Sequence, residues 1–458
     1  MRQKGATGMI QRRRRERQPR LRVWWRLGLL ALAALMLLLG ACGQSVAVGS
    51  TSLLDGAPVG STAAMQQALV AQNQRLEALR HQWLLDATVE WYLGRMSLDD
   101  ELGQMLMNRC ACGGGTYSPY LATMVERQHI GGLIFYADNF GGSLADTQAL
   151  MRQIQGNAPV PLFTGTDQEG GLVNRIGKYF GAFPSAPAMG RSGNPQEAYD
   201  TGARVAADLL AMGINNDIAP VVDVPLDPNA SWIGYRAFST DPKRVALYAG
   251  QYVAGLQSHG AIATLKHFPG IGSITEDPHD TLPVIGRTLD QFRQVELYPY
   301  QQMLADEPGM IMATDVLVPS VDAEYPAEIS PKWIDGILRQ EMGYDGVVAT
   351  DAIWMAGLTE HFSIPEASVL AVVAGDDIIE GAANAAMSQQ IINALRGAVA
   401  SGRISKARID QSVRRILRLK LRYGLLTIPS QIAMMSLQFG APPAAAADFR
   451  YPHLVVAR

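Results

Sequence analysis

Short apolar runs alternate with longer amphipathic stretches along most of the chain, beginning near Met96. Strand-length runs that alternate with segments long enough for helices are typical of a parallel sheet. Eight such repeats over about 330 residues predict a (β/α)8 TIM-type barrel. The predicted strands are Gly103–Asn108, Gly131–Tyr136, Pro161–Thr166, Ile214–Pro220, Ala261–Leu265, Met310–Thr314, Gly346–Thr350 and Val372–Ile379.

Charged residues directly follow several of these apolar runs. Charges beside buried segments are costly unless they converge on a solvated site, and the carboxyl ends of all barrel strands meet at one mouth. We therefore expect a polar site there. The alternative, that each carboxylate caps the following helix, does not account for a Lys-His pair at one strand end. These charges are Asp167, Asp223, Lys266 with His267, Asp315 and Asp351.

The densest candidate chemistry lies in Lys266–Pro283, Lys-His-Phe-Pro-Gly-Ile-Gly-Ser-Ile-Thr-Glu-Asp-Pro-His-Asp-Thr-Leu-Pro. A Lys-His pair is followed, in a Gly- and Pro-containing loop, by the Asp-x-His pair Asp277 and His279. This pattern resembles the signature of family 3 glycoside hydrolases, in the β-N-acetylhexosaminidase branch. Motifs around Asp167, Arg236 and Asp351 match in family order, and the resemblance covers roughly residues 98–425.

The resemblance implies three catalytic residues. Asp351 takes the place of the nucleophile that attacks the anomeric carbon, and His279 that of the proton donor, with Asp277 as its partner. Retaining glycosidases need a carboxylate on one face of the sugar and a proton donor on the other. A carboxylate beside a histidine favours imidazolium and fixes the ring tautomer. The alternatives are a helix-capping aspartate and an ordinary surface-loop histidine.

The resemblance also implies a ring of sugar-binding residues at the barrel mouth. Lysine, arginine and carboxylate groups suit the recognition of sugar hydroxyls, whereas the alternative is a set of ordinary ion-paired rim residues. The implied ligands are Asp167, Arg175, Arg236, Lys266 and His267.

Four positions depart from the family pattern and affect substrate detail and loop motion, while the nucleophile and the Asp-x-His pair are intact. Leu172 replaces an arginine, Ile271 and Asp315 each replace a histidine, and Pro278 replaces a serine.

Charge divides the chain in two. Residues 1–41 hold ten Lys/Arg and one Glu, a net of +9, which leaves 29 cations and 41 anions, a net of −12, in the remainder. A body that acidic argues against nucleic-acid binding.

The basic stretch precedes 14 apolar residues, Leu27–Gly40, and then Cys42. This layout predicts a lipoprotein signal peptide, with lipidation at Cys42, and places the body outside the cytoplasm. The alternative is an uncleaved membrane anchor.

The remaining segments carry less chemistry. We expect a tether and spacer helix or domain cap over residues 42–95, one catalytic domain over 96–426, and a tail over 427–458. The Lys and Arg side chains of the basic helix near 408–426 are expected to be solvated. Cys110 and Cys112 are separated by one residue, which argues against a disulfide, and they lack neighbouring metal ligands.

The sequence thus predicts a lipid-anchored, exo-acting, retaining β-N-acetylhexosaminidase. The resemblance implies release of terminal N-acetylglucosamine from muropeptide or chitin-type oligosaccharides, a role in peptidoglycan turnover, and no metal or cofactor. We expect a monomer. Two alternatives stay open: another family 3 β-glycosidase such as a β-glucosidase, although such relatives usually take their acid from a second domain, and a carbohydrate-binding lipoprotein without catalysis. Whether water or phosphate is the acceptor is also open.

Overall fold

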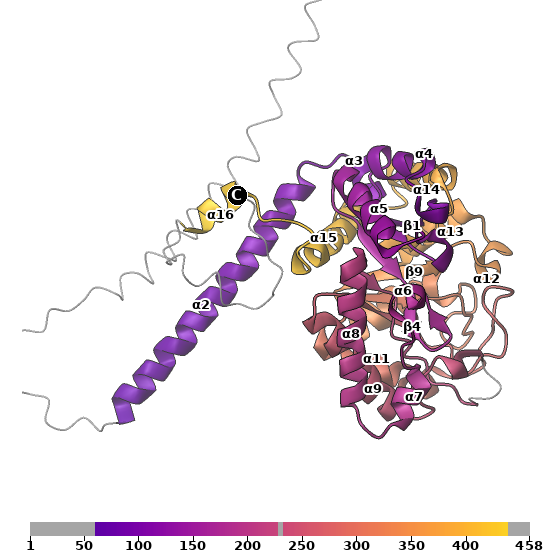
Figure 1. The fold of residues 1–458 in the computed structure, drawn as a ribbon, viewed down its shortest axis with the longest axis horizontal. Coiled ribbons are helices and arrows are strands. Elements are labelled where there is room, and N and C mark those ends of the chain that lie inside the picture. The colour runs from indigo at the N-terminus through magenta and orange to yellow at the C-terminus, as the bar shows by residue number, and fades with distance from the viewer. Residues whose placement is uncertain (1–59, 228–231, 438–458) are drawn as a thin grey trace, which may run out of the picture. The chain divides into compact units, whose positions relative to one another are not determined.

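The computed structural model describes residues 60–227 and 232–437 (Figure 1). The chain divides into two compact units, Met1–Gln74 and Arg75–Arg458. The predicted signal peptide and Cys42 lie outside the described residues. Helix α2 (Gly60–Leu93) crosses the boundary between the units, and its second half belongs to the larger one.

The larger unit contains a closed barrel in which every neighbouring pair of strands is parallel, in the order β1-β10-β9-β8-β7-β6-β3-β2. This arrangement confirms the predicted (β/α)8 barrel. The barrel strands are β1 (Leu106–Arg109), β2 (Gly132–Ile134), β3 (Phe163–Thr166), β6 (Asn216–Asp217), β7 (Ile262–Phe268), β8 (Met310–Ala313), β9 (Val347–Ala352) and β10 (Ile378–Glu380). A separate hairpin pairs β4 (Gln168–Gly170) with β5 (Val173–Asn174).

Several predicted strand boundaries differ from the structure: the run Gly103–Asn108, for example, begins inside helix α3 (Leu98–Gln104), and β1 starts only at Leu106. The run Val372–Ile379 begins inside helix α13 (Ile364–Ala374), because Gly375, at a φ of 128°, ends that helix before the strand starts at Ile378. Strand β7 continues through Lys266 and His267 to Phe268. These two polar residues therefore lie within the barrel wall, where their side chains are buried.

Helices cover the outside of the barrel (Figure 1). Two of them, α8 and α9, pack closely because glycines face the partner backbone: a Cβ on Gly202 would lie 2.2 Å from the carbonyl oxygen of Tyr252. Besides α2 and α13, the described α-helices, α8 and α9 included, are α3 (Leu98–Gln104), α4 (Pro119–Ala122), α5 (Leu144–Asn157), α6 (Gly177–Phe180), α7 (Ala186–Arg191), α8 (Gln196–Met212), α9 (Pro242–Ser258), α10 (Leu289–Gln294), α11 (Leu297–Met303), α12 (Ala356–Thr359), α14 (Ala385–Ala400), α15 (Lys406–Arg422) and α16 (Ser430–Leu437).

Helix α15 forms an ion pair with the second half of α2, and its residue Lys420 is buried in the core. Arg414 pairs with Glu90 at 2.6 Å on α2. Lys420 is fully buried, with its Nζ 2.7 Å from Gln104 Oε1 and 5.0 Å from the ring centroid of Phe163. Burial lowers the pKa of Lys420 to about 7. The prediction that the cations of this helix are all solvated is therefore wrong, because the whole side chain of Lys420, including its amine, is buried.

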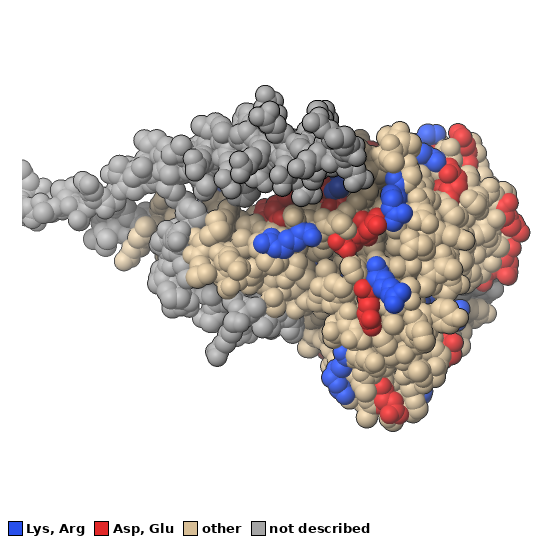
Figure 2. Space-filling view, turned by 90° about the horizontal axis from the view of Figure 1, so that it is seen from above, with Lys and Arg blue, Asp and Glu red and all other residues tan. Residues whose placement is uncertain are grey.

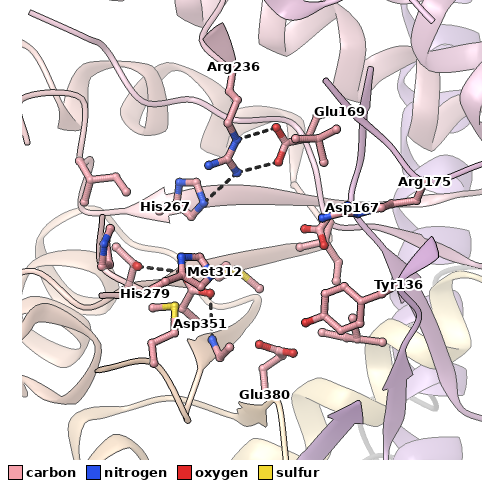
Figure 3. A pocket seen from close by; sticks show the side chains of 18 of the residues that line it. Tyr136, Asp167, Glu169, Arg175, Arg236, His267, His279, Met312, Asp351 and Glu380 are labelled. Carbon is pink, nitrogen blue, oxygen red and sulfur yellow. Dashed lines mark hydrogen bonds and ion pairs between the residues drawn. The ribbon is translucent and has the colours of Figure 1, made fainter. Parts of the chain in front are cut away.

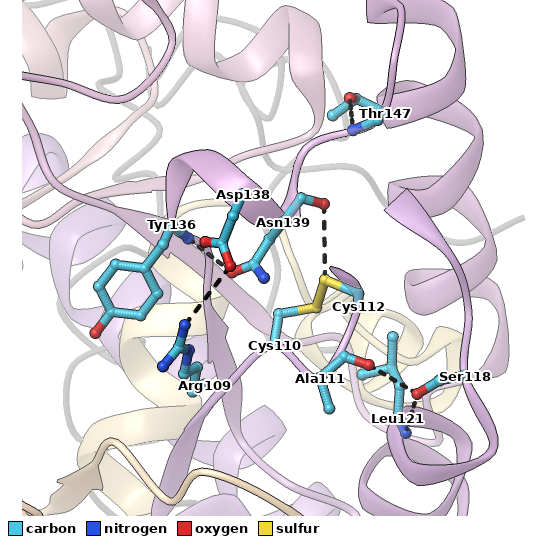
Figure 4. The surroundings of a disulfide bond; sticks show 11 residues. Arg109, Cys110, Ala111, Cys112, Ser118, Leu121, Tyr136, Asp138, Asn139 and Thr147 are labelled. Carbon is cyan, nitrogen blue, oxygen red and sulfur yellow. Dashed lines mark hydrogen bonds and ion pairs between the residues drawn. A yellow bond between two sulfur atoms is a disulfide. The ribbon is translucent and has the colours of Figure 1, made fainter. Parts of the chain in front are cut away.

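Cys110 and Cys112 form a disulfide (Figure 4), which corrects the expectation that one intervening residue forbids it. In the turn that follows the disulfide, Gly114 and Gly115 adopt φ values of 68° and 78°. The two Cα atoms are 5.2 Å apart, within the roughly 4.4–6.8 Å that disulfides span. The sulfur of Cys112 also lies 3.9 Å from the carbonyl oxygen of Asn139, in the loop after β2.

Acidic and basic side chains are interspersed on the face of the molecule in Figure 2. Exposed ion pairs of the larger unit include Arg396 with Asp99 at 2.8 Å and Arg403 with Glu366 at 2.5 Å. Exposed pairs of this kind contribute little to stability. None of the helices in residues 60–227 and 232–437 has both the length and the apolarity needed to span a bilayer.

Candidate active site

A cavity of about 400 Å³ lies at the mouth of the barrel and gathers most of the predicted site residues (Figure 3). Of the eight candidates from the folded region, six line it; Lys266 and Asp277 do not line it but bond to Asp167 and His279, which do. The six lining candidates are Asp167, Arg175, Arg236, His267, His279 and Asp351. The strand ends therefore converge as the sequence predicts.

One side of the cavity is a network of buried ion pairs, which we call the ion-paired wall (Asp167, Glu169, Arg236, Lys266 and His267). Lys266 Nζ lies 2.6 Å from Asp167 Oδ1 and 2.8 Å from Glu169 Oε1. Arg236 donates to both oxygens of Glu169, at 2.8 and 2.7 Å. Such bidentate pairs fix orientation as well as charge.

The negative charge of Glu169 offsets the positive charges of Lys266 and Arg236 in this wall. The sequence alone gave Glu169 no role. Burial would raise the pKa of the Glu169 carboxyl, but the neighbouring cations Lys266 and Arg236 hold that pKa well below its ordinary value. Burial would likewise lower the pKa of Lys266, and Asp167 and Glu169 raise it instead. All of these groups stay charged near neutral pH. Asp167 is the more exposed carboxylate, at 19% against 4% for Glu169, so it offers oxygens to a ligand.

His267 is oriented by a carboxylate beneath it. Its Nδ1 lies 2.7 Å from Asp223 Oδ2, and the other oxygen of Asp223 accepts a hydrogen bond of 2.8 Å from the backbone N–H of Ile271. This contact assigns the proton to Nδ1 and directs Nε2 toward Arg236, 3.4 Å away. Asp223, predicted only as a charged strand end, is a positioning residue that ties β7 to the loop after it.

Asp351 lies in β9 with both carboxylate oxygens held. Thr314 Oγ1 donates to Oδ2 at 2.8 Å, and the backbone N–H of Ala352 donates to Oδ1 at 2.8 Å. The following helix, α12, has Met355 at its N-cap and no side-chain cap. The helix-capping alternative therefore does not apply. The result is a fixed carboxylate that faces the cavity and is able to act as a nucleophile.

His279 and Asp277 lie in the loop after β7, which we call the dyad loop (residues 270–283). His279 Nδ1 is 2.8 Å from Asp277 Oδ1, so the predicted pair forms. The two side chains are 47% and 40% exposed. The indole of Trp354 is the aromatic neighbour, with ring centroids 6.0 Å apart. This geometry holds Nδ1 against the carboxylate and fixes the orientation of the imidazole ring.

A buried carboxyl pair, Asp315 and Glu328, lies behind the nucleophile. Glu328 Oε2 accepts from the backbone N–H of Asp351 at 3.1 Å, and both acids are fully buried. Burial raises the pKa of Asp315 and of Glu328, and their mutual hydrogen bond needs a proton on one of them. Asp315 is thus both a departure from the family pattern and part of a neutralised pair. The sequence reasoning missed Glu328 because it lies in a mixed polar segment that carries no motif.

The other predicted departures lie around the cavity. Leu172 is 81% exposed on its rim, whereas Ile271 is fully buried in its lining. Pro278 accepts a hydrogen bond of 3.2 Å from the backbone N–H of Gly357, which ties the dyad loop to the segment after β9. Arg175, a predicted ligand, lies 5.9 Å from the ring centroid of Tyr136. Within the described residues, no group of three or more His, Cys, Asp or Glu side chains is arranged to hold a metal ion.

Comparison with known proteins identifies the family and supports the fold. The model of the glycosyl hydrolase family 3 N-terminal domain matches residues 97–419. The chain belongs to glycosyl hydrolase family 3. Its fold is similar to that of a family 3 β-N-acetylglucosaminidase from Paenibacillus sp. str. FPU-7, with a TM-score of 0.70 and 32% identity over 75% of this chain and 68% of that one.

Curated family 3 relatives cover much of the same region. A β-hexosaminidase from Idiomarina loihiensis is 35% identical over 58% of this chain and 80% of that protein. The β-hexosaminidase LpqI of Mycobacterium tuberculosis is 32% identical over 65% of this chain and 77% of that protein. The predicted enzyme class, a glycoside hydrolase, is confirmed. The individual residue roles, the monomeric state, the lipid anchor and the location stay predictions.

Proposed function

We propose that this protein is a retaining exo-β-N-acetylhexosaminidase that releases terminal N-acetylglucosamine from muropeptide or chitin-type oligosaccharides. The observation that carries the proposal is the placement of a fixed carboxylate, Asp351, and a paired histidine, His279, on one cavity whose other side is the ion-paired wall. The hexosaminidase names of the relatives support the substrate class.

In the first half of the reaction, Asp351 attacks the anomeric carbon while His279 donates its proton to the glycosidic oxygen. The bond between that carbon and oxygen breaks, the shortened oligosaccharide leaves as an alcohol, and the sugar is held as an ester of Asp351. In the second half, His279 takes a proton from water as the water oxygen attacks the same carbon. The ester breaks, and Asp351 and protonated His279 are restored.

The ion-paired wall binds the sugar in this scheme. Asp167 accepts hydrogen bonds from hydroxyl groups, while Arg236 donates to sugar oxygens. Because these side chains are already held by charge-assisted hydrogen bonds, the sugar meets a preorganised surface. A cavity of about 400 Å³ suits one terminal sugar ring and favours exo action.

Release of 4-nitrophenol from the N-acetylglucosaminide and from the glucoside tests the proposal. We expect turnover of the first to exceed that of the second by at least about tenfold, since a site built for one group rejects analogues that lack it. Faster turnover of the glucoside would favour another family 3 β-glycosidase, and no turnover of either would favour a binding protein. Adding phosphate and measuring sugar phosphate in the products separates hydrolysis from phosphorolysis.

We also propose that the mature protein begins at an acylated Cys42 and is anchored to a membrane outside the cytoplasm. The basic stretch, the 14 apolar residues 27–40 and the following cysteine support this, and a disulfide at Cys110–Cys112 is compatible with an oxidising compartment. Cys42→Ala should release the protein from the membrane fraction or leave it unprocessed. Mass spectrometry that finds an intact N-terminus in the soluble cytoplasm would rule the proposal out.

A further inference from the structure

The floor of the cavity carries a carboxyl group that the reaction scheme does not use. Glu380 is the last residue of β10, where it pairs in register with Ala352 of β9 and Met107 of β1. It therefore lies on the strand next to the one that carries Asp351. Its side chain lines the cavity although the residue is only 2% exposed. In Figure 3 its carboxyl lies between Asp351 and Tyr136.

The backbone of Glu380 is satisfied by the barrel, but its side chain is not. The N–H donates to Thr350 Oγ1 at 3.0 Å, and the carbonyl oxygen accepts from the N–H of Ile353 at 3.1 Å. The side-chain oxygen Oε1 is buried and has no hydrogen-bond partner among the described residues. A buried polar atom without a partner is destabilising. Because the side chain lines the cavity, a ligand oxygen there would give this carboxyl group a hydrogen-bond partner.

The charge state of Glu380 follows from its neighbours. It is faced by Asp351 from β9, by Asp167 after β3, by Lys266 from β7 and by Tyr136 after β2. Burial raises the pKa of Glu380 well above its ordinary value, Asp351 and Asp167 raise it further, and Lys266 offsets part of the rise. Burial and the two neighbouring carboxylates therefore favour the neutral acid, which carries an O–H donor.

We propose that Glu380 is a specificity-determining residue whose carboxylic acid donates a hydrogen bond to an oxygen of the sugar held against Asp351. The proposal rests on the proposed function. It predicts that the cavity accepts an uncharged sugar with a hydroxyl or acetamide oxygen at this position. An ionised carboxylate would instead favour a cationic amino sugar such as glucosamine, so the two charge states of Glu380 have opposite preferences.

The test compares sugar binding by wild type, Glu380→Gln and Glu380→Leu with calorimetry, using N-acetylglucosamine and glucosamine as probes. The amide keeps a neutral donor of the same shape, so Glu380→Gln should bind N-acetylglucosamine within about threefold of wild type. Leucine has no donor, so Glu380→Leu should weaken binding about 10- to 100-fold. With rising pH, wild type should lose affinity as Glu380 ionises, and Glu380→Gln should keep it.

The chain offers a matched control. Asp376 lies just before the other end of β10, is fully buried, and has two side-chain oxygens without hydrogen-bond partners among the described residues, but it does not line the cavity. Burial also raises the pKa of Asp376. Asp376→Asn should therefore leave sugar affinity and its pH dependence unchanged. A loss in Asp376→Asn equal to that in Glu380→Leu would show that any buried acid on this strand acts through folding alone.

Three results would overturn the proposal: unchanged affinity in Glu380→Leu, an equal loss in Glu380→Gln and Glu380→Leu, or tighter binding of glucosamine than of N-acetylglucosamine by wild type. If Glu380→Leu does not fold, Glu380→Met and the pH dependence of Glu380→Gln decide the same question. Wild-type turnover of the nitrophenyl N-acetylglucosaminide and glucoside is measured first, and if the glucoside is preferred, the proposed function fails and the variants are compared with glucose instead.

Discussion

The two sides of the cavity are built in opposite ways. In the ion-paired wall, Lys266 and Glu169 are 2% and 4% exposed and bond directly to each other. In the dyad loop, His279 and Asp277 are 47% and 40% exposed and bond to one another. A sugar can therefore be recognised by a surface that is fixed before it arrives, whereas the proposed proton donor and its partner are half-exposed side chains on a loop.

Because the two sides differ in this way, we expect substitutions in them to affect stability and catalysis differently. Changes in the wall should affect folding and binding together, because each charge there neutralises another in a low-dielectric environment. Changes in the dyad loop should affect the chemical step with little effect on folding. Asp351 combines features of both, since its backbone and side chain are held by the barrel but its carboxylate faces the cavity.

The largest expected effect belongs to Asp351. Asp351→Ala should lower kcat/KM by roughly four orders of magnitude or more, because it removes covalent catalysis. The melting temperature should change little, since the strand's core packing is unaffected. A 2-fluoro sugar with a good leaving group should label Asp351, as detected by peptide mass spectrometry. Labelling of Asp167 or Asp315 would place the nucleophile on another strand.

The next effect tests the ion-paired wall. Lys266→Met should lower the free energy of unfolding by about 3–5 kcal/mol, because it leaves Asp167 and Glu169 together without their shared cation. Denaturant titration measures this. His279→Ala is the matched control from the dyad loop and should stay within about 0.5 kcal/mol of wild type. Equal losses in the two variants would mean that the two sides are not built differently.

A smaller effect is expected from Asp277. Asp277→Ala should reduce turnover of poor leaving groups about tenfold, because the imidazolium loses the carboxylate 2.8 Å away that supports it. A leaving-group series on wild type and Asp277→Ala measures this loss. An equal loss for good and poor leaving groups would indicate a structural role for Asp277.

The smallest effect concerns the buried pair behind the nucleophile. Because the folded pKa values of Asp315 and Glu328 are raised, the folded state holds a proton that the unfolded chain releases above the ordinary carboxyl range. Stability should therefore fall as pH rises toward the raised values, by about 1.4 kcal/mol per pH unit for one proton.

Glu328→Gln removes the need for that proton, so its unfolding free energy should vary less with pH than that of wild type. Turnover should change only a few-fold, since the amide oxygen still accepts from the backbone N–H of Asp351. Thermal unfolding from mildly acidic to mildly alkaline pH measures the slope. Asp277→Asn, on the exposed loop, is the control and should keep the wild-type slope. An unchanged slope in Glu328→Gln would contradict the shared proton.

The sequence sufficed for the barrel and for residues whose role is written in a local motif. The alternation of apolar runs with amphipathic stretches predicted the eight strands. The Asp-x-His pair and the motif around Asp351 identified the catalytic candidates through the family resemblance. Glu169, Glu328 and Glu380 were given no role because their meaning comes from tertiary neighbours: a lysine 97 residues along the chain for Glu169, and Asp351 on a neighbouring strand for the other two. The sequence around each of these residues does not indicate that its side chain is buried.

Two errors had the same origin. Lys420 was assigned to solvent because charged residues are rarely fully buried, yet Gln104 and Phe163 of distant segments surround its amine. The disulfide between Cys110 and Cys112 was rejected on sequence spacing alone, whereas the folded backbone places their Cα atoms 5.2 Å apart. In both cases the deciding quantity was a three-dimensional distance.

The most direct test of the central claim, that His279 is the proton donor, is a comparison of His279→Ala with wild type across a series of leaving groups. The account predicts a strong loss for oligosaccharides, which leave as poor alkoxides, and a weak loss for activated nitrophenyl glycosides, which need little protonation. Added azide should partly restore turnover of the activated substrates, because azide attacks the Asp351 ester without a general base. An equal loss for good and poor leaving groups, with no rescue by azide, would contradict the assignment.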